Sequence, residues 1–154
     1  MKSAKLHDIS TEFDIARENA VRDFYAANLN TLRDGRERLV GTEMVHANSL
    51  VRADMRTVDS NDVIREWEFK LVADYSALGQ ILVYTAALKV HYNFQRDIRG
   101  VIAALKIPPE ISQAVRVGAL NIELVVIPSW IYNAGAPTKK QANIPRRFAL
   151  PSTS

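Results

Sequence analysis

Three charged residues occupy alternate positions of one predicted strand. Residues 63 to 71, VIREWEFKL, alternate between apolar and polar side chains, a pattern typical of a β-strand. Because successive side chains of a strand point to opposite faces, Glu66, Glu68 and Lys70 share one face. Charges on a buried strand are costly unless they are paired or bind a metal ion. The row therefore predicts an ionic partner or a metal site on this face.

Asp54 joins this row if the strand before it forms a hairpin with it. Residues 50 to 58 read as a strand, and the turn-forming sequence DSND at residues 59 to 62 separates the two strands. For a tight turn there, the numbers of facing residues sum to about 121 or 122, and a sum of 122 places Asp54 opposite Glu68. Such like charges repel unless a cation lies between them, and Mg²⁺ or Mn²⁺ prefers these oxygen ligands. We therefore expect a divalent-metal site, with Lys70 placed to orient a metal-bound water or neutralise a phosphate.

The remaining elements form an α/β pattern. Residues 10 to 34 are predicted to form a long helix, which Ser10 or Thr11 caps and Gly35 ends. Its apolar face is predicted to contain Phe13, Ala16, Ala20, Phe24 and Ala27. The elements that follow are predicted as strands at 37 to 46, 50 to 58 and 63 to 71, a helix at 75 to 92 begun by Asp74 or Ser76, a strand at 100 to 107, a short helix opened by Pro108 and Pro109, and a strand at 121 to 127. The order α-β-β-β-α-β-α-β predicts an α/β fold with a mixed sheet flanked by helices on both faces.

The charged row resembles the signature of a known nuclease superfamily. Asp54, a hairpin and then Glu68-x-Lys70 look like the signature of the PD-(D/E)XK, or restriction-endonuclease-like, superfamily, whose core is also α-β-β-β-α-β. Residues 77 to 84, ALGQILVY, are similar to the "aGQllrY" helix of RecB-like and NucS-like members. The resemblance runs through RLVGTEM to RGVIAALKIPPE and covers roughly residues 10 to 127.

This resemblance implies a divalent-metal phosphodiesterase that acts on DNA. Asp54 and Glu68 are the implied metal ligands, together with the backbone carbonyl of Phe69. Lys70 and Gln80 are implied to position the water and the phosphate. The implied cofactor is Mg²⁺ or Mn²⁺, which lowers the pKa of a bound water and stabilises the charge that develops on the phosphate.

Two positions depart from the superfamily's pattern. The proline that usually precedes the aspartate is Ala53 in this chain. NucS-like members also carry a metal-binding glutamate on the first helix. Counting back from Gly35 places Arg22 at that position, with Glu18 one helical turn earlier, so Glu18 is an additional candidate.

Other residues near the row have simpler interpretations. Glu66 is either an additional site residue or, as we favour, a solvated or salt-bridged acid. Glu43 lies either at the rim of the site or on the surface, and His46 is interpreted as structural and not as a general base. Trp67 and Phe69 are expected in the core on the opposite face of the sheet. The core is also expected to contain three residues at helical spacing, Tyr84, Leu88 and Tyr92.

Composition limits the classes of function. Of the 154 residues, 47% are hydrophobic, 24% are charged and none is cysteine. The lack of a long apolar stretch and of a secretory signal peptide leads us to expect a cytoplasmic protein with no membrane partner. The lack of cysteine excludes a disulfide scaffold, a cysteine-ligated zinc site and a thiol nucleophile.

The positive charge is concentrated at the C-terminal end. All 17 acidic residues lie at or before Glu123, and the net charge of +3 divides into −1 for residues 1 to 137 and +4 for residues 138 to 154. We predict a nuclease-like domain over the first range and a basic tail over the second, with irregular, proline-rich structure beginning after residue 127. The cations of this tail are either DNA contacts, as we favour, or a solvated terminus. They are Lys139, Lys140, Arg146 and Arg147.

The sequence as a whole predicts a metal-dependent DNA endonuclease of the PD-(D/E)XK type. Three alternatives remain open at this point. The first is a Holliday-junction resolvase that acts as a homodimer, because such an enzyme cuts two strands symmetrically. The second is an inactive nuclease-fold protein that binds DNA or a protein partner. The third is the same metal chemistry directed at RNA or a nucleotide.

Overall fold

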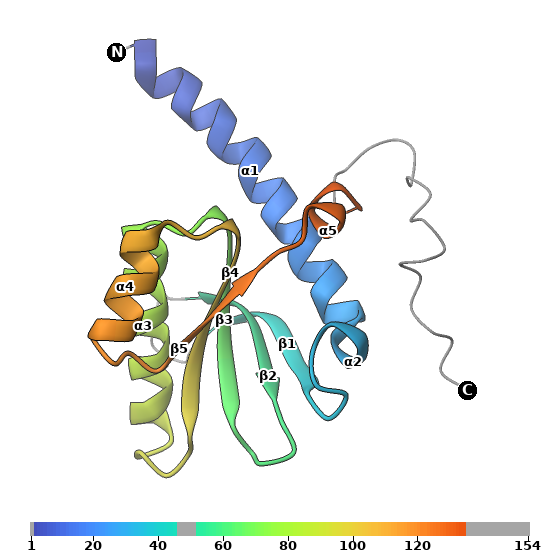
Figure 1. Cartoon of the computed structure of the whole chain (residues 1–154), viewed down its shortest axis with the longest axis vertical. Helices are drawn as coiled ribbons and strands as arrows, with labels where there is room; N and C mark the ends of the chain where they lie inside the picture. The colour runs from blue at the N-terminus through green and yellow to red at the C-terminus, as the bar shows by residue number, and fades with distance from the viewer. Residues whose placement is uncertain (1, 46–51, 135–154) are drawn as a thin grey trace.

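A five-stranded mixed sheet with helices on both faces forms the protein. The computed structural model describes residues 2–45 and 52–134 (Figure 1). The helices are α1 (Lys2–Ala27), α2 (Leu29–Leu32), α3 (Tyr75–His91), α4 (Pro109–Val117) and α5 (Ser129–Ala134). The strands are β1 (Arg38–Val45), β2 (Arg52–Val58), β3 (Ile64–Val72), β4 (Ile98–Lys106) and β5 (Ile122–Val126), in the sheet order β1-β2-β3-β4-β5. The first three strands are antiparallel and the last three are parallel, which confirms the predicted α/β fold.

Each face of the sheet has its own core. Figure 1 shows α1 and α5 on one side of the sheet and α3 and α4 on the other. On the first side, Trp67 and Phe69 stack with their ring centroids 5.7 Å apart and pack against Val21 and Tyr25 of α1. This contact confirms the core position predicted for the two aromatic residues. On the second side, the core is formed by residues that include Ile81, Tyr84, Ile102 and Ile111. None of the described helices is long and apolar enough to cross a membrane.

The register of the β2–β3 hairpin matches the predicted sum of 122. Met55 pairs with Trp67 and Arg56 pairs with Glu66. The indole N–H of Trp67 donates to Oγ1 of Thr57 at 2.9 Å on one face, while Arg56 and Glu66 form an ion pair on the other. Because side chains alternate along both strands, Asp54 and Glu68 come to the same face as that ion pair.

Helix α3 lies close to the sheet because Gly100 has no side chain. A Cβ atom at this position of β4 would lie 2.7 Å from Cγ1 of Ile81 on α3, which is closer than real Cβ contacts come. The helix begins at Asp74, whose carboxylate accepts a hydrogen bond from the Ala77 N–H at 2.8 Å. Of the two predicted caps, Asp74 is therefore the one used. Gly100 thus sets the distance between α3 and the sheet, and the Asp74 cap sets the residue at which α3 begins. Both features position Gln80, which α3 carries.

The predictions for the first helix were wrong in extent and orientation. The helix already includes Lys2, so neither Ser10 nor Thr11 caps it, and it ends at Ala27. Asn28 interrupts it, because its side-chain amide donates to the Phe24 carbonyl at 2.7 Å. The residues of the helix that reach the core are led by Val21 and Tyr25, whereas Ala16 and Ala27, predicted to be buried, are exposed. Large side chains decide the orientation, since an alanine buries little apolar area.

The segment after residue 127 is partly helical, in contrast to the irregular structure predicted for it. Helix α5 begins directly after Pro128. A proline suits the start of a helix because the first N–H groups there have no helical partner. The Pro128 carbonyl still accepts a hydrogen bond from the Ile131 N–H at 3.0 Å. Ile131 is fully buried against α1, and the Trp130 ring meets Phe24 edge to face at 6.0 Å. The burial of Ile131 and the partial burial of Trp130 offset the conformational entropy that is lost when the segment becomes ordered.

We expect the replacement Ile131→Ala to destabilise the protein by about 2–5 kcal/mol, because it leaves a cavity between α5 and α1. The measurement is urea-induced unfolding of the purified chain. Val126→Ala is the matched control, because Val126 is 62% exposed and its loss is expected to change the free energy of unfolding by less than about 0.5 kcal/mol. Equal stabilities for the two variants would contradict the docking of α5.

Candidate active site

An open pocket of about 950 Å³ lies between α1, α3 and one end of the β1–β2–β3 meander. The residues named from the sequence meet here: Asp54 comes from β2, Glu68 and Lys70 from β3, and Gln80 from α3. The rest of the lining consists of Ile15, Glu18, Asn19, Val45, Arg52, Ser76, Gly79, Val83 and Tyr84. Two strands and one helix thus place the predicted catalytic residues in one cavity that is open to solvent.

Asp54 is held by the backbone of the opposite strand. Its Oδ2 atom accepts a hydrogen bond from the Phe69 N–H at 2.7 Å. Burial raises the pKa of Asp54, and the Phe69 N–H and the nearby Lys70 ammonium oppose that rise. The carboxylate therefore has a fixed orientation in a place that disfavours its negative charge.

Glu68 is the most constrained acid of the pocket. The residue is 4% exposed, and its Oε1 atom lies 3.5 Å from Nζ of Lys70. Its Oε2 atom is buried and has no hydrogen-bond partner among the described residues. Burial and then the negative charge of Asp54 raise the pKa of Glu68 to about 8. In the absence of a further cation, Glu68 therefore holds a proton at neutral pH.

Gln80 and Tyr84 face this acid from one side of α3. The side-chain oxygen of Gln80 is buried and lacks a hydrogen-bond partner within the described part of the chain. Tyr84 follows one helical turn later, and burial together with Glu68 and Asp54 raises the pKa of its hydroxyl to about 12. The pocket thus contains two unsatisfied buried oxygens, one from a strand and one from a helix. Buried polar atoms without partners are rare in folded proteins, so both oxygens are available to a water, an ion or a ligand.

The carboxylate that α1 contributes to the pocket is Glu18. Its Oε1 atom accepts a hydrogen bond from the Leu71 N–H at 3.2 Å, and burial raises its pKa against the opposing effect of Lys70. Arg22, which counting from Gly35 placed at this position, is buried beside it and pairs with Asp23 at 3.0 Å. The helix ends at Ala27 and not at Gly35, and Glu18, the additional candidate named from the sequence, lines the pocket while Arg22 does not.

Several sequence candidates lie away from the pocket. Glu66 is fully buried and pairs with Arg56, so it is salt-bridged, as favoured, but not solvated. Glu43 is exposed and its Oε1 atom lies 3.4 Å from Nη1 of Arg22. Of the residues predicted as core, Tyr84 and Leu88 are buried and Tyr92 is partly buried. His46 and the basic residues Lys139, Lys140, Arg146 and Arg147 lie outside the described residues.

Among the charged and aromatic residues of the pocket, sequence reasoning missed two as site residues, Arg52 and Tyr84. Arg52 precedes Asp54 by two positions on a strand, so period-two alternation alone places both on one face. Tyr84 follows Gln80 by four positions on a helix, which places both on one side. It was assigned to the core, where it does pack, but it also lines the pocket.

The donor set suits a hard divalent cation that keeps several waters. The described residues contain no group of three or more His, Cys, Asp or Glu side chains able to hold a metal ion by themselves. Mg²⁺, however, is commonly bound through one or two carboxylates, with water or phosphate oxygens completing its coordination. Asp54 and Glu68 supply two such carboxylates, and one oxygen of Glu68 is unpartnered. The residues present therefore fit such an ion.

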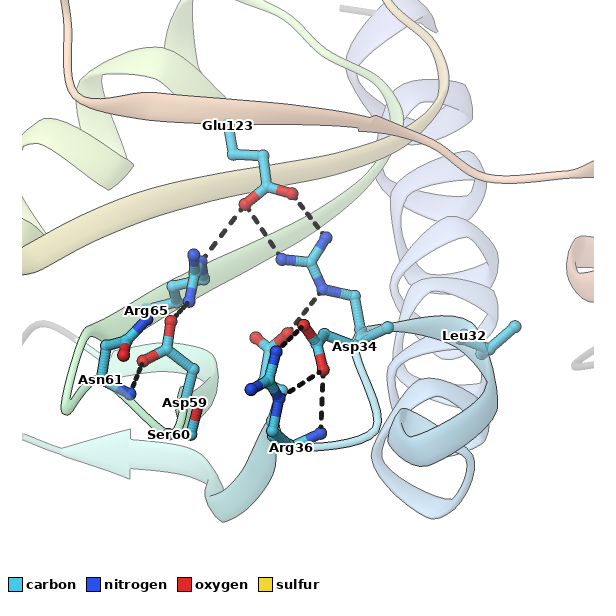
Figure 2. A pocket seen from close by; sticks show the side chains of 10 residues that line it. Leu32, Asp34, Arg36, Asp59, Ser60, Asn61, Arg65 and Glu123 are labelled. Atoms are coloured by element: carbon cyan, nitrogen blue, oxygen red, sulfur yellow. Dashed lines mark hydrogen bonds and ion pairs between the residues drawn. The ribbon is translucent and has the colours of Figure 1, made fainter.

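A second pocket, of about 400 Å³, lies at the opposite end of the strands and is filled with paired charges (Figure 2). Glu123 of β5 accepts hydrogen bonds from Arg33 at 2.9 Å and from Arg65 at 3.3 Å. Arg65 also donates to Asp59 at 2.8 Å, and Arg33 to Glu37 at 2.8 Å. Arg33 further lies over the Trp67 ring, 4.8 Å from its centroid. These mutual pairs join α2, the hairpin and β5, so we interpret this pocket as structural.

The fold is similar to that of EndoMS and of a repair endonuclease whose structures are known. The chain superposes on a complex of EndoMS with double-stranded DNA with a TM-score of 0.56 and 17% identity, covering 69% of this chain and 43% of that one. A repair endonuclease from Pyrococcus abyssi gives a TM-score of 0.56 and 20% identity, covering 69% and 45%. EndoMS in its apo form gives 0.54 and 17%, covering 72% and 47%. The chain thus spans less than half the length of these neighbours.

At this level of identity the likeness establishes the fold, and it confirms the predicted restriction-endonuclease-like architecture. No family model matches the chain. No curated protein matches it either.

The raised pKa of Glu68 makes stability fall as the pH rises. In the folded protein this acid keeps its proton up to a pKa of about 8, whereas the unfolded chain loses it near 4.5. Between these values the folded state binds more protons, so the free energy of unfolding falls by up to about 1.4 kcal/mol per pH unit. Glu68→Gln removes this loss, and we expect the variant to be more stable than the wild type at pH 8. Urea unfolding at a series of pH values without divalent cations measures the difference.

Glu110→Gln is the control for this measurement, because Glu110 is an exposed acid of α4. It is expected to keep the pH dependence of the wild type. Two results would contradict the buried, acid-facing environment of Glu68. One is a wild type whose free energy of unfolding does not fall toward pH 8, and the other is a Glu68→Gln variant whose free energy of unfolding falls as much as that of the wild type.

Proposed function

We propose that this chain is a metal-dependent DNA endonuclease that hydrolyses phosphodiester bonds. The observation that carries the proposal is the pocket in which Asp54, Glu68, Lys70 and Gln80 converge, with an unpartnered buried oxygen on Glu68. The fold it shares with repair endonucleases supports the same class of reaction. DNA as the substrate is part of the proposal, and it is supported by the neighbour in complex with double-stranded DNA.

The metal site of the proposal consists of Asp54, Glu68 and the carbonyl of Phe69. Mg²⁺ or Mn²⁺ held there would lower the pKa of a bound water and stabilise the charge that develops on the phosphate. Burial raises the pKa of both carboxylates, and Lys70 opposes that rise without cancelling it. A positive ion would favour the charged form of both acids.

The chain's own groups orient the reacting atoms. The Lys70 ammonium, 3.5 Å from Oε1 of Glu68, has donors that can hold a water in line with the phosphate and neutralise a phosphate oxygen. The Gln80 amide offers an oxygen to accept a hydrogen bond from that water and an N–H₂ group to contact the phosphate. The Phe69 N–H keeps Asp54 in place, and the Leu71 N–H does the same for Glu18. Two carboxylates, Asp54 and Glu18, are thus oriented before substrate arrives, which lowers the entropic cost of the reaction.

We expect Lys70→Ala to lower the rate of cleavage by about 100-fold or more, because it removes the group that orients the nucleophile. Asp54→Asn is expected to have an effect at least as large. The measurement uses labelled linear, nicked, four-way-branched and single-stranded DNA, together with RNA, in Mg²⁺ or Mn²⁺. Lys89→Ala, at the far end of α3, is the matched control and should cleave like the wild type.

Unchanged metal-dependent cleavage by Lys70→Ala would contradict the assignment of the site. Absence of cleavage of every nucleic acid by the wild type, with binding retained, would contradict the proposed catalysis.

A further inference from the structure

Arg52 is a positive side chain at the mouth of the candidate site. It lies on β2 two residues before Asp54, so the two side chains share one face of the strand, and both line the pocket. The Arg52 side chain is 59% exposed, whereas that of Lys70 is 24% exposed. These are the two cations of the lining, which also contains three acids, Glu18, Asp54 and Glu68. A polyanion that approaches the pocket therefore meets Arg52 before it meets Lys70.

The guanidinium of Arg52 has a weak partner in Glu43. Nη1 of Arg52 lies 3.9 Å from Oε1 of Glu43, which is beyond hydrogen-bond distance. The same oxygen lies 3.4 Å from Nη1 of Arg22, a residue that is buried and fixed by Asp23. Because Glu43 is shared with Arg22 and lies 3.9 Å from Arg52, it holds Arg52 only weakly. Within residues 2–45 and 52–134, no hydrogen bond to another side chain restrains its guanidinium.

The positive charge of Arg52 reaches the centre of the pocket. It opposes the rise in the pKa of Asp54 and the rise in the pKa of Tyr84, which means that its field acts on both groups. By contrast, the arginines of the second pocket, Arg33 and Arg65, are each held by carboxylates at 2.8 Å. Arg52 thus combines closeness to the candidate metal ligands with donors that a ligand is able to use.

We infer that Arg52 binds a phosphate of the nucleic-acid strand next to the scissile phosphate. When it does so, its contact with Glu43 is replaced by the contact with the phosphate. The inference rests on the proposed function, because it assigns the substrate contact of the same pocket. The guanidinium has a planar set of donors that matches two phosphate oxygens at once. In the free protein Glu43 keeps this group near the pocket, and the weakness of the contact makes its loss inexpensive. The contact does not depend on the base sequence, since every nucleotide carries the same phosphate.

The test is equilibrium binding of a labelled DNA duplex to the full chain in Ca²⁺ at several salt concentrations. Arg52→Ala is expected to weaken binding about tenfold at low salt and to reduce the slope of log K against log salt by about 0.9. Arg36→Ala is the matched control, because Arg36 is also an exposed arginine with an acidic neighbour, Asp34, but lies at the second pocket (Figure 2). It should bind like the wild type.

The exchange of partners is tested by Glu43→Gln in two backgrounds. Removing the negative charge frees Arg52, so the variant should bind DNA more tightly than the wild type. In the Arg52→Ala background the same change should give little gain, which a general loss of negative charge near DNA does not predict. In cleavage assays, Arg52→Ala should raise KM with kcat nearly unchanged, because the contact is made before and during the reaction alike.

The two proposals fail in different ways. Equal affinity and salt dependence for wild type and Arg52→Ala, in a protein that cleaves DNA, overturn the role of Arg52 alone. A gain from Glu43→Gln that is the same in both backgrounds, or no gain in either, overturns the exchange. A wild type that neither binds nor cleaves nucleic acid overturns the proposed function and this inference with it.

Discussion

The constraint on which the site depends is the cost of burying two carboxylates, Asp54 and Glu68, on one face of the β2–β3 hairpin. Burial raises the pKa of both acids, and their mutual repulsion raises that of Glu68 further. Lys70 offsets part of this cost, and the Phe69 N–H fixes the geometry. A site of this kind is unfavourable when empty of positive charge, and it becomes favourable when a cation enters. The unpartnered oxygen of Glu68 marks where the compensation is incomplete.

The rest of the fold holds that pair in register. On the opposite face of the same strands, Trp67 bonds to Thr57 and stacks on Phe69, so a slip of one residue would expose two buried rings. At the far end, Glu123 joins Arg33 and Arg65 and thereby ties the start of β3 to β5 and α2. The paired charges therefore lie at one end of the sheet and the polar pocket at the other. This division allows the pocket to keep unsatisfied groups without unfolding the domain.

The hairpin was predictable from the sequence because few parameters decide it. The turn at residues 59 to 62 sets the sum of facing residues, and alternation then assigns the faces, so Asp54, Glu68 and Lys70 followed. The first helix was less predictable. Alanines and large residues count alike in an apolar pattern, whereas the free energy of burial depends on the apolar area. The face of α1 that packs on the sheet is therefore the one that carries Val21 and Tyr25. The interruption at Asn28 depends on a side-chain bond to the Phe24 carbonyl, which no periodicity reports.

Glu18 and α5 show what tertiary contacts add. Glu18 enters the pocket because α1 crosses the end of β3, where it accepts the Leu71 N–H, and counting along a helix of unknown end placed Arg22 there instead. The six residues of α5 are too few to form a stable helix alone, so their helicity depends on Ile131 being buried against α1. Both features arise where distant segments meet. Arg52, in contrast, followed from alternation once Asp54 was recognised.

If Asp54 and Glu68 form a cation site, Glu68 must lose its proton when the ion binds. Calorimetric titration of Mn²⁺ into the protein at pH 7, in two buffers with different heats of ionisation, counts the protons released. Because burial and the charge of Asp54 raise the pKa of Glu68 to about 8, we expect release of close to one proton per ion, and almost none from Glu68→Gln. Mn²⁺ binding that releases no proton, or the same number from Glu68→Gln as from the wild type, would contradict it.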